Sequence, residues 1–391
     1  GQARRGERRV LDASSGWALA ALLPIGYTRT ALPAYEKFAA ETSPLPFFGY
    51  TAVAGFGGRI WVSAMATDRP ERWLARSFDP RHLQRLVDQR LSQSPENRVL
   101  RQHAHCALDY QCPTASNLFF GRWEGAIAVS GGCNARCIGC ISKQEEDELI
   151  SPQDRLPFVP TVEEVVEVAV AHLTRSPNAI ISFGQGCEGE PLLQARIIEK
   201  SIRAIRERTS SGVININTNA SNPLALQRLY DSGLDMLRAS TISARPSTYD
   251  AYYRPIGYSV AQVKQSLSQA RDSGVFSSIN LLCVPGLTDT EVELEALVEL
   301  LRETGVRLVQ LRNLNIDPEV LWPRLPDDCR PGSTSLGAAL GMSQLVQTLG
   351  SSLPGLAIGS FSRAVRRWPG GTRADPAAGA PATAPAPPED R

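Results

Sequence analysis

The chain has 391 residues, 42% of them hydrophobic, so it is long enough to bury a sizeable core and to form two or three domains. Its 41 basic and 40 acidic residues give a net charge of +1, which makes a nucleic-acid partner unlikely. The longest early apolar run, "WALAALLPIGY", is broken by Pro24 and too short to span a bilayer, so no membrane association is predicted. Eight cysteines, several at short spacing, indicate metal ligation in a reducing compartment and hence a cytoplasmic location.

The first third of the chain lacks the regular alternation of strands and helices that follows it. Residues 1–14 read as a solvated tail, and 15–124 as a small α+β domain. Within that domain, β-type residues around Gly57 and Gly58 predict a hairpin, and residues 79–93 predict a helix.

Residues 125–320 alternate short apolar strands with amphipathic helices, the pattern of parallel βα units. Thr161 with Glu164, and Thr288 with Glu291, are spaced as helix capping boxes, and glycines stand where helices should stop. The units predict a parallel barrel or a doubly wound sheet. Strands are expected at 125–130, 179–183, 213–217, 235–240, 277–284 and 307–311. Residues 321–368 are predicted as a helical extension, and the Pro- and Ala-rich 369–391 as disordered.

The stretch "SGGCNARCIGCIS" places Cys133, Cys137 and Cys140 just after the first of these strands. Three thiolates suit three corners of a cubane iron–sulfur cluster, leaving one iron with an open position. The alternative is a structural zinc ion held by these three and a fourth ligand, for which the candidates are His103, His105, Cys106 and Cys112.

At these residues the chain resembles the radical S-adenosylmethionine (radical SAM) superfamily, over about 125–317, in its "CNARCIGC" motif and in the order of its elements. The resemblance implies an α/β fold with a partial (β/α)6 TIM-like barrel, a [4Fe–4S] cluster bound by the three cysteines, and S-adenosylmethionine on the unique iron. It also implies reductive cleavage of that cofactor to a 5'-deoxyadenosyl radical.

Polar residues at the ends of later strands are candidate cofactor contacts. The "GEP" of "SFGQGCEGEPLL" resembles the family's Gly-Gly-Glu motif, except that Glu188 replaces its first glycine. Ser240 matches a position that often contacts the ribose, with Ser243 as an alternative. Asn217 either faces the cofactor or caps the next helix, and Arg254 either lies near the cofactor carboxylate or on the surface. The predicted cofactor-binding residues are Gly189, Glu190, Asn217, Ser240 and Arg254.

Other polar residues at the barrel rim are candidates for substrate contact, and no catalytic residue is assigned. The alternative is that these residues belong to a solvated loop without a role in binding. The substrate candidates are Asn280, Arg312, Asn313, Asn315 and Asp317.

A second metal near Cys106 and Cys112 is a further prediction, with buried free cysteines as the alternative. Cys187, inside the glycine-rich loop, either fills that loop's interior or relays a radical.

The leading functional hypothesis is an enzyme that uses radical chemistry on an unidentified substrate, with an electron donor such as flavodoxin or ferredoxin. The competing hypotheses are a non-catalytic zinc-binding or interaction protein and a radical modifier of RNA. The even charge balance disfavours the RNA modifier.

Overall fold

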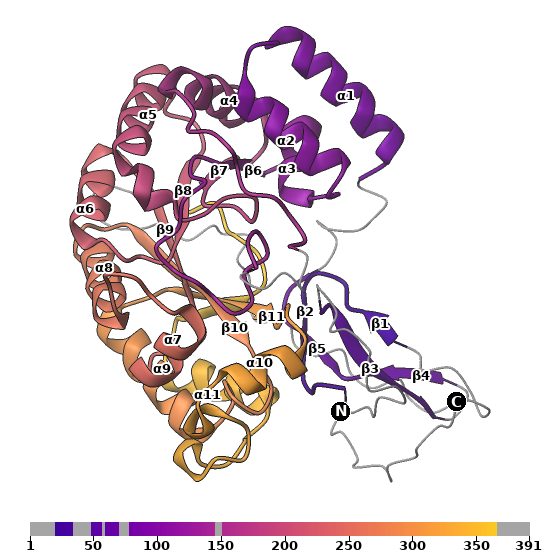
Figure 1. Ribbon diagram of the computed structural model, residues 1–391. Coiled ribbons are helices and arrows are strands. Elements are labelled where there is room, and N and C mark those ends of the chain that lie inside the picture. The colour runs from indigo at the N-terminus through magenta and orange to yellow at the C-terminus, as the bar shows by residue number, and fades with distance from the viewer. Residues whose placement is uncertain (1–19, 34–47, 57–58, 70–77, 145–150, 366–391) are drawn as a thin grey trace.

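The computed structural model describes residues 20–33, 48–56, 59–69, 78–144 and 151–365, and the predicted tails fall wholly outside these ranges. A parallel seven-stranded sheet, whose strands are adjacent in chain order, curls inside an arc of helices (Figure 1). Its two edge strands do not pair with each other, so the barrel is partial, as predicted for the α/β class. The strands are β6 (Glu124–Ile127), β7 (Ile180–Phe183), β8 (Val213–Thr218), β9 (Met236–Thr241), β10 (Phe276–Cys283), β11 (Leu308–Asn313) and β12 (Ala357–Gly359).

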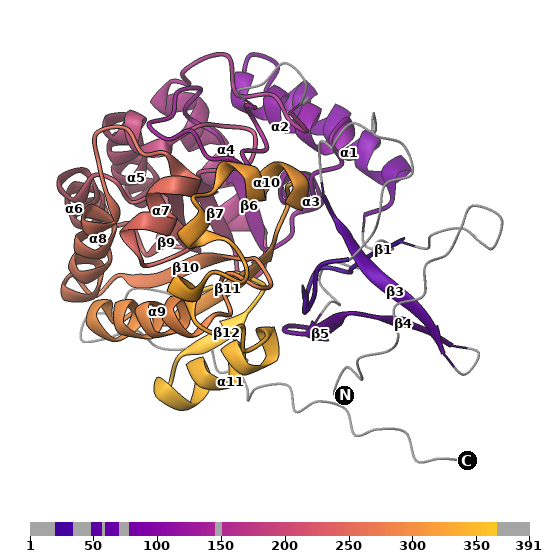
Figure 2. The same ribbon diagram turned by 60° about the horizontal axis from the view of Figure 1, so that its bottom comes forward.

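The helices of this part cover the outer face of the sheet or stand at its rim (Figure 2). They are α4 (Val162–Arg175), α5 (Ala195–Arg208), α6 (Pro223–Ser232), α7 (Pro246–Tyr253), α8 (Val260–Asp272), α9 (Glu291–Thr304), α10 (Pro318–Arg324) and α11 (Met342–Ser352). No helix in the described ranges is long and apolar enough to cross a bilayer.

Local sequence signals explain where several helices begin and end. Thr161 and Glu164 form the predicted capping box of α4 through reciprocal hydrogen bonds of 3.2 and 2.8 Å. The predicted box at Thr288 is wrong, because α9 begins after Thr290. The Thr288 hydroxyl instead bonds the backbone of Val284 in a tight turn, and the Glu291 carboxylate accepts from a distant backbone N–H.

The segment predicted as a helical extension also contributes a strand. β12 pairs in parallel with β11, so the sheet has seven strands rather than six. A three-residue strand carries too little alternation to be detected from its sequence.

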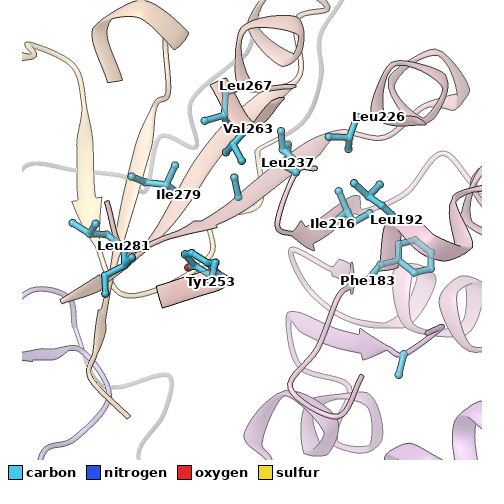
Figure 3. Packing of buried hydrophobic residues seen from close by; sticks show 14 of the residues in the cluster. Phe183, Leu192, Ile216, Leu226, Leu237, Tyr253, Val263, Leu267, Ile279 and Leu281 are labelled. Atoms are coloured by element: carbon cyan, nitrogen blue, oxygen red, sulfur yellow. The ribbon is translucent and has the colours of Figure 1, made fainter. Parts of the chain in front are cut away.

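A continuous apolar layer lies between the sheet and the helices. Figure 3 shows Leu237 and Ile279 of the sheet beside Val263 and Leu267 of α8, all of them buried. The same cluster includes Val99 and other residues of α1 (Pro80–Gln93), α2 (Arg98–Leu108) and α3 (Pro113–Phe120). These three helices therefore share the core of the barrel.

Five short strands precede those helices: β1 (Ala20–Leu22), β2 (Tyr27–Arg29), β3 (Tyr50–Phe56), β4 (Arg59–Val62) and β5 (Ala64–Ala66). β3 and β4 pair antiparallel as the predicted hairpin, although its tip, Gly57 and Gly58, lies outside the described residues. Asn313 of the barrel attaches β2, because its amide exchanges hydrogen bonds with the backbone of Tyr27 and Arg29 at 3.0 and 2.8 Å.

The amino-terminal end of the barrel is closed by the last described segment. Val365 packs among the residues that begin the strands, including Trp123 and Val213. Inside the barrel, the Glu124 carboxylate accepts hydrogen bonds from Ser362 at 2.5 Å and Arg238 at 3.2 Å. Both members of this ion pair are at most 8% exposed.

We predict that Arg238→Met lowers the free energy of unfolding by about 3 kcal/mol, because the buried Glu124 carboxylate loses its ion-pair partner. Arg203→Met is the matched control: Arg203 pairs with Glu199 at the surface, where such pairs contribute about 1 kcal/mol or less. Urea denaturation followed by circular dichroism measures both. Equal effects of the two substitutions would contradict a stabilising role for the buried pair.

Candidate functional site

The three-cysteine loop leaves the carboxyl end of β6 and is held by the end of α7. Backbone N–H groups of Arg136 and Ile138 donate to the carbonyls of Tyr253 and Tyr252, each at 3.0 Å. From the other direction, the N–H of Ile256 donates to the carbonyl of Asn134 at 2.9 Å. The loop is therefore fixed by main-chain pairing, which does not depend on its cysteine side chains.

The electrostatic surroundings of the three thiols differ. Burial raises the pKa of Cys133 and Cys137, and at Cys137 the two neighbouring thiols add to the rise. Burial acts in the same direction on Cys140, but hydrogen bonds from Ser142 and Arg155 outweigh it and lower its pKa. The Arg155 guanidinium donates to the Cys140 sulfur at 3.4 Å. Arg155 has no motif around it and was missed by the sequence reasoning.

The spacing of the sulfurs distinguishes a cluster from a single ion. One tetrahedral zinc holds sulfurs at about 2.3 Å from itself, and so within about 4 Å of one another. A cubane cluster binds each thiolate at a separate iron, so it spreads its ligands more widely. Cys133, Cys137 and Cys140 are all free thiols, the usual donors of such a cluster, so the donor set fits a [4Fe–4S] cluster.

The glycine-rich loop after β7 lies directly against the cysteine loop. The N–H groups of Gly189 and Glu190 donate to the carbonyls of Ser130 and Gly132, both at 2.7 Å. A Cβ atom on Gly189 would lie 1.9 Å from the Gly132 carbonyl oxygen, so any larger residue there would push the two loops apart.

Glu188 organises this loop from inside. Its carboxylate accepts four backbone N–H groups, from Val129, Ser130, Gly184 and Gln185, at 2.7 to 3.0 Å. Burial raises the pKa of Glu188 to about 7, while these four hydrogen bonds favour the ionised form. In sequence terms Glu188 was only a departure from a motif, yet it joins the ends of two strands.

Glu190 binds the end of β8. Its carboxylate accepts from the hydroxyl of Thr218, and from the backbone N–H groups of Leu192 and Asn219 at 2.9 and 2.8 Å. Burial raises the pKa of Glu190 to about 7. Asn217 also belongs to this contact, because its amide donates to the carbonyl of Gly184 at 2.7 Å.

The remaining predicted cofactor residues, Ser240 and Arg254, lie on other elements. Ser240 is on β9, in register with Asn280 of β10. Arg254 ends α7 with a left-handed backbone, φ 46°, directly beside the segment that pairs with the cysteine loop. Ser243, the alternative to Ser240, is buried and donates to Glu293 of α9 at 2.5 Å.

The substrate candidates separate into two groups. The Arg312 guanidinium donates to Asn280 at 3.1 Å, and this pair connects neighbouring strands of the barrel. The others have structural partners: Asn313 attaches β2, Asn315 donates to the carbonyl of Gly139 at 2.9 Å, and Asp317 caps α10.

The second metal predicted near Cys106 and Cys112 stays a prediction, and among the described residues the structure places possible ligands around Cys106 only. A compact set of His103, Cys106 and Cys187 exists, with its ligand atoms within 4.8 Å of one another, and Cys112 is not a member. Cys112 stands at the start of α3, and His105 is exposed beside Asp109.

Three comparisons with known proteins bear on identity. Residues 127–301 match the family model described as Radical SAM superfamily. No curated protein matches the chain.

Solved structures are similar at low identity. TYW1 with a lysine-pyruvate adduct bound is 14% identical, with 58% of this chain and 73% of that chain covered and a TM-score of 0.39. Streptococcus suis SuiB bound to S-adenosylmethionine is 13% identical, with 57% and 46% covered and a TM-score of 0.38. A radical SAM methyltransferase from Sphaerobacter thermophilus is 16% identical, with 60% and 65% covered and a TM-score of 0.39. Similarities of this size carry no argument about function.

The family match spans the cysteine loop, the loop after β7 and the strands through β10. Residues 127–301 are therefore a radical SAM superfamily domain, and the protein that carries it is an enzyme.

Proposed function

We propose that this enzyme cleaves S-adenosylmethionine reductively and uses the resulting radical on a substrate inside the barrel. The carrying observation is the main-chain pairing of the cysteine loop with the loop after β7, which brings Gly189 and Glu190 against the residue preceding Cys133. Cys133, Cys137 and Cys140 would hold a [4Fe–4S] cluster, which when bound supplies the electron for cleavage of the sulfonium. A flavodoxin or ferredoxin would supply the electron in turn.

The roles of the chain's own residues follow from their contacts. Gly189 lets the loop after β7 pack directly against the cysteine loop, and the Glu190 carboxylate would attract the ammonium group of the cofactor there. Ser240 would contact the ribose from β9, and Asn217 would act indirectly by holding the Gly184 turn. Arg254 would stand near the carboxylate of the cofactor from the end of α7.

The interior of the barrel supports a substrate that carries an anionic group. Glu124, Arg238 and Arg312 bear one negative and two positive charges, so together they leave one net positive charge. Burial lowers the pKa of Arg312 to about 10, which still keeps it charged near neutral pH. Within the described residues its guanidinium bonds only the neutral amides of Asn280 and Gln310. A carboxylate or phosphate of the substrate would complete this arrangement.

We predict that anaerobically purified protein is brown, absorbs broadly near about 400 nm, and forms 5'-deoxyadenosine with dithionite and S-adenosylmethionine. Cys137→Ser should lose both the iron and the product, because one corner of the cluster loses its ligand. Cys283→Ser is the control: Cys283 is buried and its thiol donates to the carbonyl of Leu281. A colourless protein with one zinc ion and no product would refute the proposal.

We predict that Glu188→Gln weakens S-adenosylmethionine binding by about tenfold or more, because the amide can accept fewer of the four backbone N–H groups that now bond the carboxylate. Equilibrium dialysis measures the affinity, and iron analysis should show the cluster retained. Glu199→Gln on α5, where the carboxylate bonds only surface arginines, should leave affinity unchanged. Unaltered affinity in Glu188→Gln would show that this loop does not shape the cofactor site.

A further inference from the structure

A buried group of sulfur and nitrogen atoms lies beside the loop after β7, outside the proposed cofactor contacts. His103 and Cys106 are three residues apart on α2, so they share one face of that helix. Cys187 reaches them from the loop, and the ligand atoms of all three lie within 4.8 Å of one another. Their exposed fractions are 0%, 1% and 4%.

The position of the proton on the His103 ring distinguishes a metal site from a pair of interacting thiols. Its Nε2 atom accepts a hydrogen bond from the N–H of Ala128 at 3.2 Å, so in the neutral ring the proton is on Nδ1. The Nδ1 atom is buried and has no partner at ordinary hydrogen-bond length in the described residues. A protonated Nδ1 has no lone pair for a metal. It can, however, stabilise a nearby thiolate, and Cys106 is the thiol that it affects.

The two thiols are arranged as donor and acceptor. The neighbouring Cys187 thiol lowers the pKa of Cys106, burial opposes this, and the nearby His103 ring lowers it further; the Gln102 amide adds a contact of 3.6 Å to the same sulfur. The pKa of Cys187 is raised, first because it donates to Cys106 and then because it is buried. A lowered pKa on one sulfur beside a raised pKa on the other is the arrangement of a reduced redox-active dithiol.

We propose that Cys106 and Cys187 form a reversible disulfide that joins α2 to the loop after β7. The oxidant would be a low-molecular-weight disulfide. The Cys106 thiolate attacks one of its sulfurs and expels a first thiolate, and Cys187, losing its proton to solvent, attacks the Cys106 sulfur and expels a second. Two protein thiols and one disulfide thereby become one protein disulfide and two small thiols.

Closure would act on the proposed cofactor loop, and this part rests on the proposed function. The two sulfurs lie within 4.8 Å of each other and a disulfide bond is about 2.05 Å long, so closure would draw Cys187 toward α2. The carbonyl of Cys187 accepts from Leu156 at 2.9 Å, and the next residue, Glu188, holds both strand ends. Oxidation therefore pulls on the residue that shapes this loop, and it should weaken binding of S-adenosylmethionine.

The test uses the full, cluster-loaded chain, equilibrated anaerobically in buffers of varied reduced-to-oxidised glutathione ratio. Free thiols are blocked with N-ethylmaleimide, and peptides are identified by mass spectrometry. We expect a peptide cross-linked through Cys106 and Cys187 to appear in one two-electron transition. Cys283 and Cys329, buried without a partner thiol in the described residues, should be recovered without a cross-link at every ratio. Cys106→Ser and Cys187→Ser should each abolish the cross-link.

Equilibrium dialysis of S-adenosylmethionine on the same samples tests the consequence for the loop. We expect affinity at least about fivefold weaker in the oxidised wild type, and no dependence on glutathione in Cys106→Ser. Unchanged affinity despite the cross-link would overturn the coupling to the loop. Two free thiols at every ratio would overturn the disulfide itself. So would one equivalent of zinc or copper, beyond the cluster iron, that is lost in Cys106→Ser. The cross-link is read without any cofactor turnover, so its failure is distinct from failure of the proposed function.

Discussion

The site depends on two short main-chain hydrogen bonds between loops that are more than fifty positions apart in the sequence. Gly189 and Glu190 donate to the carbonyls of Ser130 and Gly132, and only a residue without a side chain permits this approach. The bonds align the ends of β6 and β7, so the cysteine loop and the glutamate loop face the same space. Glu188 strengthens the alignment from below through backbone N–H groups of both segments.

Around this contact, the polar residues that the sequence offered as cofactor or substrate contacts have two structural roles. Asn217 and Asn315 bond loop carbonyls and thereby position the site. Arg312 and Asn280 connect strands within the barrel and keep a positive charge there. The polar rim of a parallel barrel is therefore partly scaffold, because loops that leave adjacent strands need side chains to satisfy their backbone groups.

Much of the fold could be predicted from the sequence because its signals are local. The Thr161 capping box and the glycines that end helices, such as Gly233, act within a few residues of themselves. The three cysteines are likewise a short-range pattern. Thr288 misled because a capping spacing recurs in tight turns, where the hydroxyl has a closer partner.

Long-range partners could not be predicted in this way. The sequence offered Cys112, six positions away, as the partner of Cys106 at a second metal, whereas the compact set that contains Cys106 includes Cys187. Arg155 reaches Cys140 across fifteen positions with no motif to mark it, and β12 is recognisable only because β11 lies beside it. In each case the information is in the tertiary arrangement and not in a spacing.

The closure of the barrel by Ser362 and Val365 has a consequence for biosynthesis. Ser362 contacts Glu124 across 238 positions of the chain, and Val365 covers the beginnings of strands made long before it. During translation the strands of the sheet can pair one after another. Until Ser362 and Val365 are synthesised, the amino-terminal end of the barrel stays open to water and Glu124 lacks its hydrogen bond from Ser362. At a translation rate of roughly 5–20 residues per second, the first strands are made many seconds before Ser362 and Val365. The barrel interior is therefore consolidated only after Ser362 and Val365 have been synthesised.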